Sequence, residues 1–508
     1  MMGPPQSRNP KLFYVGVNLE QRVDPDHPLR KIAAAVDFGF VRPLVADLYG
    51  VRGNPSLDPA LVLKLLFLLF YENISSERQL LRQLPQRLDW LWFLEMDLDS
   101  PIPDHSVLSK ARRRWGPKVF TDFFKQILRQ CVQAGLVDGA RVHVDGSVIA
   151  ANADQDKLTL ALELVGQEFY GKLEADGQPL APAPSPESPA SSAVSSSSGP
   201  PGQTPPETSS MPVPPALVPP GTLYCPTDPE ARLTQKGGVN ILGYKDHRVV
   251  DDQCGIITAS LTTAATVAEA SMLQRAMDTH EENTGLRIVE PTADRGYGTV
   301  EVYRMLQARG CLPCIPHPAV REDKSKFPRS LFIYDPRQDV YRCPAGQTLH
   351  RRGVAFDGRY RYQTQGRICE ACSVRGQCTA SSTVRVLSRQ VHQEAIDWAD
   401  HCLSQAQRRI RMRRRKIRAE GSFADASNRH GYKRARWRGL AGMTNQNLLI
   451  ASIQNVRKLV RYGHRRPPGS ARRLATYASA LSPITPKRHR WPGDRHRNHI
   501  QNNGQCKR

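Results

Sequence analysis

The chain has 508 residues, of which 71 are Lys or Arg and 48 are Asp or Glu, so its formal net charge is +23. A positive excess of this size indicates a polyanionic partner, and nucleic acid is favoured over an acidic membrane surface. The most apolar stretch, residues 60–70, is interrupted by Lys64. It is about half as long as the ~20 residues that span a bilayer, so no membrane association is expected. Eleven cysteines are few for a secreted disulfide scaffold, which favours a cytoplasmic protein.

Residues 12–135 are predicted to form a helical N-terminal domain. Apolar residues recur at helical spacing after Asp58-Pro59, a pair typical of a helix start. A later helix is expected to present a basic face. This face is interpreted as DNA-binding, with a plain helical scaffold as the alternative. Its basic residues are Arg112, Arg113 and Arg114.

Residues 140–316 are predicted to form the first part of a mixed α/β core. The order of elements is a strand, two strands around a turn at 251–255, a helix, a strand, a helix and a short strand. A Pro/Ser-rich segment, 174–221, interrupts this core and is expected to be disordered. Residues 317–390 are predicted to be a Cys-containing insertion. Residues 391–463 are predicted to form the helical end of the core, and 464–508 are expected to be a basic disordered tail.

Three acidic residues occupy positions suited to a metal site. Asp145 lies in the first predicted strand, Asp294 lies at the carboxyl end of a later strand, and Glu420 lies on a long basic helix. Alone, each could be a turn residue or a surface acid, but strand ends converge on one edge of a sheet and a packed helix can add a third group. Three carboxylates suit Mg²⁺ or Mn²⁺, and two such ions could promote displacement at phosphorus.

Four cysteines in the insertion could build a separate site. One Cys-x₂-Cys pair with two further cysteines could hold a structural Zn²⁺, although the spacing is looser than that of a paired Cys-x₂-Cys knuckle. The four residues are Cys343, Cys369, Cys372 and Cys378.

Residues 405–439 contain thirteen Lys or Arg against two acids. Such a run can bind a DNA backbone with release of counterions. Tyr432 and Trp437 could stack on an unpaired base, or could pack within the fold. The basic residues expected to contact DNA are Arg413, Lys416, Lys433, Arg434, Arg436 and Arg438.

Over roughly residues 12–462 the sequence resembles the DDE transposases of bacterial insertion sequences. The segments that carry the resemblance include "PDHSVLSKARRRWG", "VHVDGSVIAANA", "PTADRGYGT" and "RAEGSFADASNRHGYKRARWRGL". The resemblance implies an RNase H-like core in which Asp145, Asp294 and Glu420 hold two Mg²⁺ or Mn²⁺ ions. It also implies binding to double-stranded DNA, at the terminal inverted repeats and at the target. A homodimer or larger assembly on bacterial DNA is expected.

One position departs from the family pattern. The family usually has a Lys seven residues after the glutamate, and here that residue is Ser427, which cannot supply a cation to a phosphate. Lys416 or Lys433 could compensate.

The expected function is DNA strand cleavage and strand transfer. The alternatives are a nuclease that does not join strands and a transposase-derived protein that only binds DNA.

Overall fold

The computed structural model describes residue 2 and residues 18–160, 223–317 and 323–463, apart from positions 51, 53, 54, 324, 356, 357, 382 and 383. The segments predicted to be disordered, 174–221 and 464–508, lie outside the described residues. Within the described part of the chain, no helix has both the length and the apolar character needed to cross a bilayer.

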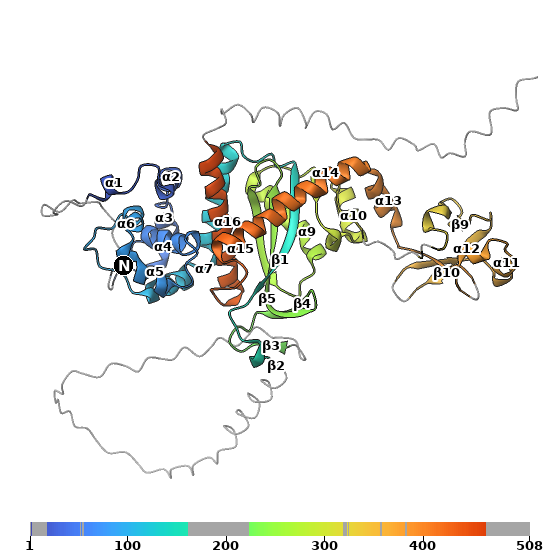
Figure 1. Cartoon of the computed structure of the whole chain (residues 1–508), viewed down its shortest axis with the longest axis horizontal. Coiled ribbons are helices and arrows are strands. Elements are labelled where there is room, and N and C mark those ends of the chain that lie inside the picture. Colours follow the sequence, from blue (N-terminus) through green and yellow to red (C-terminus); the bar gives the residue numbers. More distant parts are fainter. Residues whose placement is uncertain are drawn as a thin grey trace, which may run out of the picture.

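A block of helices precedes the sheet (Figure 1). Its central helix, α4, begins as predicted: the Asp58 carboxylate accepts a hydrogen bond from the Ala60 N–H at 3.3 Å, and Pro59 occupies the first turn. Most side chains of α4 are buried, so this helix forms the centre of the block's core. The helices are α1 (Leu19–Arg22), α2 (Pro28–Ala35), α3 (Val41–Val45), α4 (Pro59–Tyr71), α5 (Glu77–Gln83), α6 (Leu88–Leu94) and α7 (His105–Gln133).

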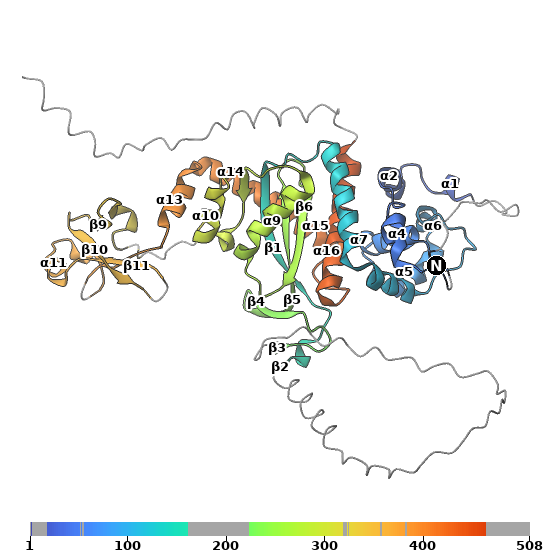
Figure 2. The same ribbon diagram turned by 180° about the vertical axis from the view of Figure 1, so that it is seen from behind.

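Helix α7 connects the block to the core but is not one continuous helix. Gly116 has φ 60° and ψ −169°, and Pro117 follows it, so the helical path breaks between these two residues. Helix α16 (Gly439–Tyr462) packs along α7. Figures 1 and 2 show the two helices side by side between the helical block and the sheet.

The central sheet has the predicted RNase H-like order. Strand β5 lies antiparallel between β6 and β1, β7 lies parallel to β1, and Cys314 continues the sheet through a parallel bridge to Thr292. The first part of β5 also pairs with β4 in a hairpin. The strands are β1 (Arg141–Ala150), β4 (Arg232–Lys236), β5 (Val239–Asp251), β6 (Ile257–Ala264) and β7 (Glu290–Thr292). This topology confirms the predicted α/β fold class.

Helices cover both faces of the sheet. Val142 and Val144 of β1 pack with α9 (Glu269–Thr284) and α10 (Val300–Ala308) on one face. Ile149 belongs to the larger core shared with α16, α15 (Gly421–His430) and the helical block. Odd- and even-numbered residues of β1 therefore contribute to different cores, as the alternation of a strand requires.

A nearly continuous helical path crosses the sheet obliquely (Figure 1). It runs from α13 (Gln393–His401), which packs on α10, through α14 (Gln405–Arg415) and a π-helical turn at Lys416–Glu420 into α15. The long basic helix predicted to carry Glu420 is thus confirmed, with the addition of the π-helical turn.

The insertion folds as a separate small sheet with its own apolar cluster of Phe332, Tyr341, Leu349, Tyr362 and Leu387. All its strands are antiparallel. Its elements are β8 (Ile333–Asp335), β9 (Val340–Arg342), β10 (Thr348–Val354), β11 (Tyr360–Gln363), α11 (Gly366–Glu370), α12 (Arg375–Cys378) and β12 (Leu387–Arg389). Two further short strands, β2 (Thr159–Leu160) and β3 (Leu223–Tyr224), pair beside the central sheet.

Candidate active site

Asp145 lies in the middle of β1 and is only 8% exposed. Its Oδ1 accepts a hydrogen bond from the Gly146 N–H at 3.0 Å. Burial raises the pKa of Asp145 to about 6, although the nearby Arg415 guanidinium opposes this rise and the Asp294 carboxylate adds to it. A carboxylate that is costly to ionise in the metal-free protein is one that gains from a bound cation.

Asp294 follows the strand that lies parallel to β1. The last pair in that register is His143 with Thr292, so Asp145 and Asp294 each lie two residues beyond it. The Asp294 Oδ1 accepts the Gly296 N–H at 2.8 Å and thereby caps a short 3₁₀ turn. The structure therefore brings Asp145 and Asp294 to the same edge of the sheet.

Glu420 reaches this edge through Arg415. An Arg415 guanidinium nitrogen lies 3.3 Å from Asp145 Oδ2, and another donates to Glu420 Oε1 at 2.9 Å. The intervening turn is π-helical, and its i→i+5 hydrogen-bonding pattern places residues five apart on one face. Arg415 thus holds a positive charge between the first and third acids.

Asp145, Asp294 and Glu420 lie in the same region, but their carboxylates do not surround a single point at which an ion could bind. Among the described residues, no three or more His, Cys, Asp or Glu side chains have the spacing of a metal site. Arg415 separates Asp145 from Glu420, and Glu420 itself keeps 44% of its side chain exposed. Binding of a cation by all three acids requires Arg415 to move aside.

The structure shows where Ser427 lies, at the position of the family lysine, and where the two lysines lie that could replace it. Ser427 donates its hydroxyl hydrogen to the Phe423 carbonyl at 2.7 Å and faces its own helix. Lys416 is exposed on the π-helical turn. The Lys433 ammonium donates to Ser147 Oγ at 2.9 Å, and Ser147 lies two residues after Asp145, on the same face of β1.

Two of the basic residues predicted to bind DNA are engaged within the fold. Arg112 pairs with Glu77 at 2.7 Å and lies 4.1 Å from the Trp437 ring. Arg436 donates to the Leu69 carbonyl at 2.9 Å, and burial lowers its pKa to about 10. These contacts join α4, α5 and α7 to the loop before α16. The residues that stay exposed are Arg113, Arg114, Arg413, Lys416, Lys433, Arg434 and Arg438.

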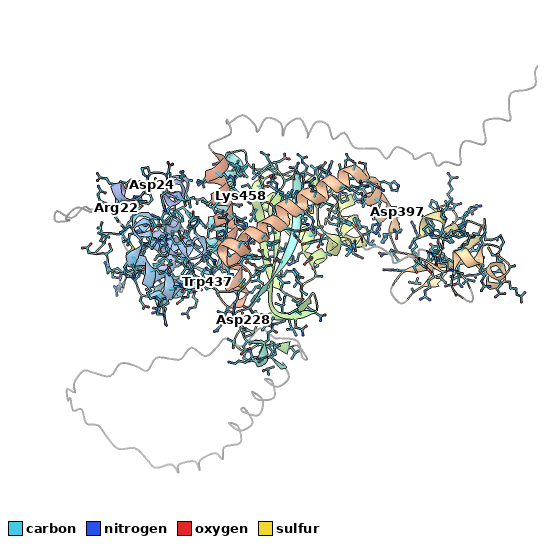
Figure 3. The ribbon with its side chains drawn as sticks, viewed as in Figure 1. Arg22, Asp24, Asp228, Asp397, Trp437 and Lys458 are labelled. Atoms are coloured by element: carbon cyan, nitrogen blue, oxygen red, sulfur yellow. The ribbon has the colours of Figure 1, made fainter. Side chains whose placement is uncertain are left out.

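Neither aromatic residue of the basic segment is available to stack on a base. Trp437 is 6% exposed, contacts Phe70 edge-to-face at 5.1 Å and donates its indole N–H to Glu77 at 3.2 Å. Figure 3 shows it at the junction of the helical block and the core. Tyr432 is fully buried. The expectation of base stacking is therefore wrong, and the alternative of packing is confirmed.

The four cysteines of the insertion line one small cavity of about 30 Å³. Burial and the other three thiols raise the pKa of Cys378, which shows that the sulfur atoms lie near one another. The Gln347 N–H donates to Cys343 Sγ at 3.3 Å, a contact that suits a thiolate. The thiols nevertheless lack the close spacing of a metal site, so the zinc prediction stays a prediction.

Sequence reasoning did not identify Arg415. It belongs to a run of basic residues that looks uniform in sequence, and only the π-helical turn singles it out. Its side chain is about 90% buried, and two of its nitrogens, Nε and one terminal nitrogen, have no hydrogen-bond partner among the described residues. Such a buried, incompletely satisfied cation is a feature of functional sites.

Comparisons with known proteins find transposase domains in two parts of the chain. Residues 17–114 match the transposase domain family DUF772, and residues 342–460, which include Glu420, match the transposase DDE domain. No curated protein matches the chain. Among solved structures, the piggyBac transposase synaptic complex with hairpin DNA, determined by cryo-EM, is 11% identical. The match covers 90% of this chain and 82% of that chain, with a TM-score of 0.28. The two domain matches together support a DDE transposase of an insertion element.

Proposed function

We propose that this transposase cuts DNA strands at the inverted repeats that end its own element and joins the freed 3′-hydroxyls to target DNA. The observation that supports the proposal best is the parallel register of β1 and β7, in which Asp145 and Asp294 each follow the last pair, His143 with Thr292, by two residues. Arg415 links Asp145 to Glu420. A cytoplasmic protein acting on bacterial DNA fits this role.

Asp145, Asp294 and Glu420 are the residues that would hold Mg²⁺ or Mn²⁺. Their oxygen donors suit hard cations. Glycine leaves space beside one of them: a Cβ added at Gly296 would lie 3.1 Å from Asp294 Oδ1. Two bound ions would activate the attacking water or 3′-hydroxyl and stabilise the leaving oxygen.

Lys433 is our choice for the cation that the family places after the glutamate. It projects over the same face of β1 as Asp145 and is exposed. Its segment is fixed by backbone hydrogen bonds, since Ala150 donates to the Lys433 carbonyl at 3.0 Å and Ala435 donates to the Ala150 carbonyl at 2.8 Å. A lysine held this way can neutralise a phosphate at the acids without moving the strand.

The exposed basic residues would bind the DNA backbone on either side of the acids. Arg413 and Lys416 lie on the helical path that carries Glu420, whereas Arg434 and Arg438 follow Lys433. Arg113 and Arg114 would extend the contact onto the helical block. Because the reaction involves two DNA ends, we propose that the active form is a dimer or larger assembly on DNA.

The test uses labelled duplexes taken from the two flanks of the coding region, with a supercoiled plasmid as target. With Mg²⁺ or Mn²⁺, the wild-type protein should cut the duplex and join it to the plasmid. Asp294→Asn should abolish both steps while its DNA affinity, measured by fluorescence anisotropy, stays within about threefold of wild type, because phosphate contacts dominate affinity.

Other outcomes would decide between the alternatives. Nicks without joined product would favour a nuclease, and binding without any cleavage by the wild-type protein would favour a protein that only binds DNA. Equal activity of Asp294→Asn and the wild-type protein would refute the proposed site.

We also propose one structural Zn²⁺ at the four cysteines. Cys343 follows β9, Cys369 is in α11, Cys372 lies between α11 and α12, and Cys378 ends α12. One ion would therefore join separate pieces of the insertion, which has a small apolar cluster of its own. A tetrahedral set of thiolates is a common zinc site.

A further inference from the structure

A fourth carboxylate lies beside the candidate active site. Glu269 is in the first turn of α9, the helix that follows β6, and it was not among the acids predicted from the sequence. Its carboxylate approaches the sheet over Gly146, the residue after Asp145. A Cβ added at Gly146 would lie 2.9 Å from Glu269 Oε1, so only a glycine leaves Glu269 this close to β1.

Glu269 also approaches the second acid. A Cβ added at Gly296 would lie 3.1 Å from Asp294 Oδ1 and 3.3 Å from Glu269 Oε2. The two carboxylates therefore face the same small space from opposite sides. Glu269 thus has a glycine beside each of its carboxylate oxygens, Gly146 in the strand and Gly296 in the loop.

Positive charge near Glu269 is limited. The Lys245 ammonium lies 3.6 Å from Glu269 Oε1, but its hydrogen bond at 2.9 Å goes to the Val267 carbonyl. Arg415 faces Asp145 and Glu420 rather than Glu269. Among the described residues, the Arg415 guanidinium is therefore paired with neither Glu269 nor Asp294.

A second observation supports a ligand near these acids and comes from Tyr297, the last residue of the 3₁₀ turn that Asp294 caps. The Tyr297 side chain is fully buried, and its hydroxyl has no hydrogen-bond partner among the described residues. Burial raises the pKa of Tyr297 well above its ordinary value, and the charges of Glu269, Asp145 and Asp294 add to this rise. A buried hydroxyl left without a partner is costly unless a bound group supplies one.

We propose that Glu269 is a fourth ligand of the divalent-cation site, where it binds the ion together with Asp294 and Asp145. This inference rests on the proposed metal-dependent function and adds a residue to it. It adds a carboxylate from α9 to those from β1 and the loop after β7. Because no three acids of the described residues have the spacing of a metal site, these three carboxylates would have to move closer together around an ion, while Arg415 still holds Glu420. Glu420 would then be recruited separately, when Arg415 moves.

The test measures Mn²⁺ binding directly, by the loss of the free-ion electron paramagnetic resonance signal, on the full chain without DNA. Glu269→Gln should weaken Mn²⁺ binding about tenfold or more, as expected when a metal site loses a carboxylate partner. Asp294→Asn should weaken it similarly. Glu282→Gln is the matched control, because Glu282 is exposed on the same helix, and its Mn²⁺ affinity should stay within about twofold of wild type.

A second variant tests the same site without removing a carboxylate, so that an effect of Glu269→Gln on folding can be distinguished from an effect on metal binding. Gly146→Ala keeps every carboxylate but places a methyl group against Glu269, and it should also weaken Mn²⁺ binding. Far-UV circular dichroism in EDTA should match wild type for each variant. If both Glu269→Gln and Gly146→Ala bind Mn²⁺ like the wild-type protein while Asp294→Asn does not, Glu269 is not a ligand and the proposed function stands. If Asp294→Asn also binds normally, the metal site itself is refuted.

Discussion

The buried pair of Arg248 and Asp246 on β5 offers a test of how the third acid is held. Both side chains are fully buried, and the Arg248 Nε donates to Asp246 Oδ2 at 2.7 Å. Arg248 also donates to Gln454 of α16 at 3.0 Å and lies 4.6 Å from the ring of Phe423 on α15. One guanidinium thus connects the sheet that carries Asp145 to the helix that continues from Glu420.

Replacing Arg248 with Met keeps most of the volume but leaves the Asp246 carboxylate buried without its counter-charge. Its remaining donors are the hydroxyls of Ser260 at 2.7 Å and Tyr432 at 3.0 Å. Breaking a fully buried ion pair costs about 3–5 kcal/mol, so Arg248→Met should lower the free energy of unfolding by that amount.

Urea denaturation followed by far-UV circular dichroism measures this loss. A second substitution, Asp246→Asn, removes the unpaired charge while keeping a partner for both hydroxyls, so the double variant should recover at least about 1 kcal/mol. Arg457→Met is the control: Arg457 pairs with Asp425 at 3.0 Å, but about a third of each side chain is exposed. It should cost about 1 kcal/mol or less. An Arg248→Met protein as stable as the control would refute the reasoning.

Four further predictions concern pH, catalysis, metal content and DNA binding. Burial lowers the pKa of His430 to about 4, so the stabilisation from keeping it neutral is complete above pH ~6.5 and is lost as the pH falls towards 4. In the wild-type protein the free energy of unfolding should therefore fall by about 1.4 kcal/mol per pH unit between these limits, and His430→Gln should remove this dependence. If the variant and the wild-type protein show the same dependence of the free energy of unfolding on pH, His430 is not a neutral, buried histidine. Lys433→Ala should slow strand transfer about 10- to 100-fold with little change in DNA affinity, measured by single-turnover assays; a parallel loss of affinity would instead make Lys433 a general DNA contact. Metal analysis should find about one Zn²⁺ per chain. Cys372→Ser should lose this ion, and the thermal stability of its insertion should fall. A wild-type protein that contains no zinc and is only as stable as Cys372→Ser would refute the zinc proposal. Replacing Arg413 and Lys416 together with Ala should reduce the slope of log affinity against log salt by about 1.8, and an unchanged slope would place the DNA elsewhere.

The sequence was most informative where local chemistry determines structure. Asp58-Pro59 marked the start of α4, and alternating β-formers around Asp145 marked β1. The topology of the sheet followed from the order of strands and helices, because parallel strands need long connections and antiparallel ones do not. The break at Gly116 was readable too, since Gly followed by Pro interrupts a helix, yet the apolar spacing on both sides disguised it.

The site was less predictable because its contacts are long-range. Glu269 sits in the first turn of a helix, where an acid is already expected from the helix dipole, so its sequence context indicated nothing more. Arg112 looked like a surface charge but is engaged with Glu77 and Trp437, residues distant from it in the chain. A run of arginines does not reveal which member lies inside the fold.

The π-helical turn also limits what spacing rules can detect among relatives of this chain. Arg415 and Glu420 meet because one extra residue is accommodated between them. A relative with an ordinary α-helix there would need its arginine four residues before the glutamate, the position that Lys416 occupies here, exposed to solvent. If the arginine were identified by counting back a fixed number of residues from the glutamate, the wrong residue would be chosen in one of the two proteins. The partner of the glutamate must therefore be identified from the structures and not from the columns of a sequence alignment.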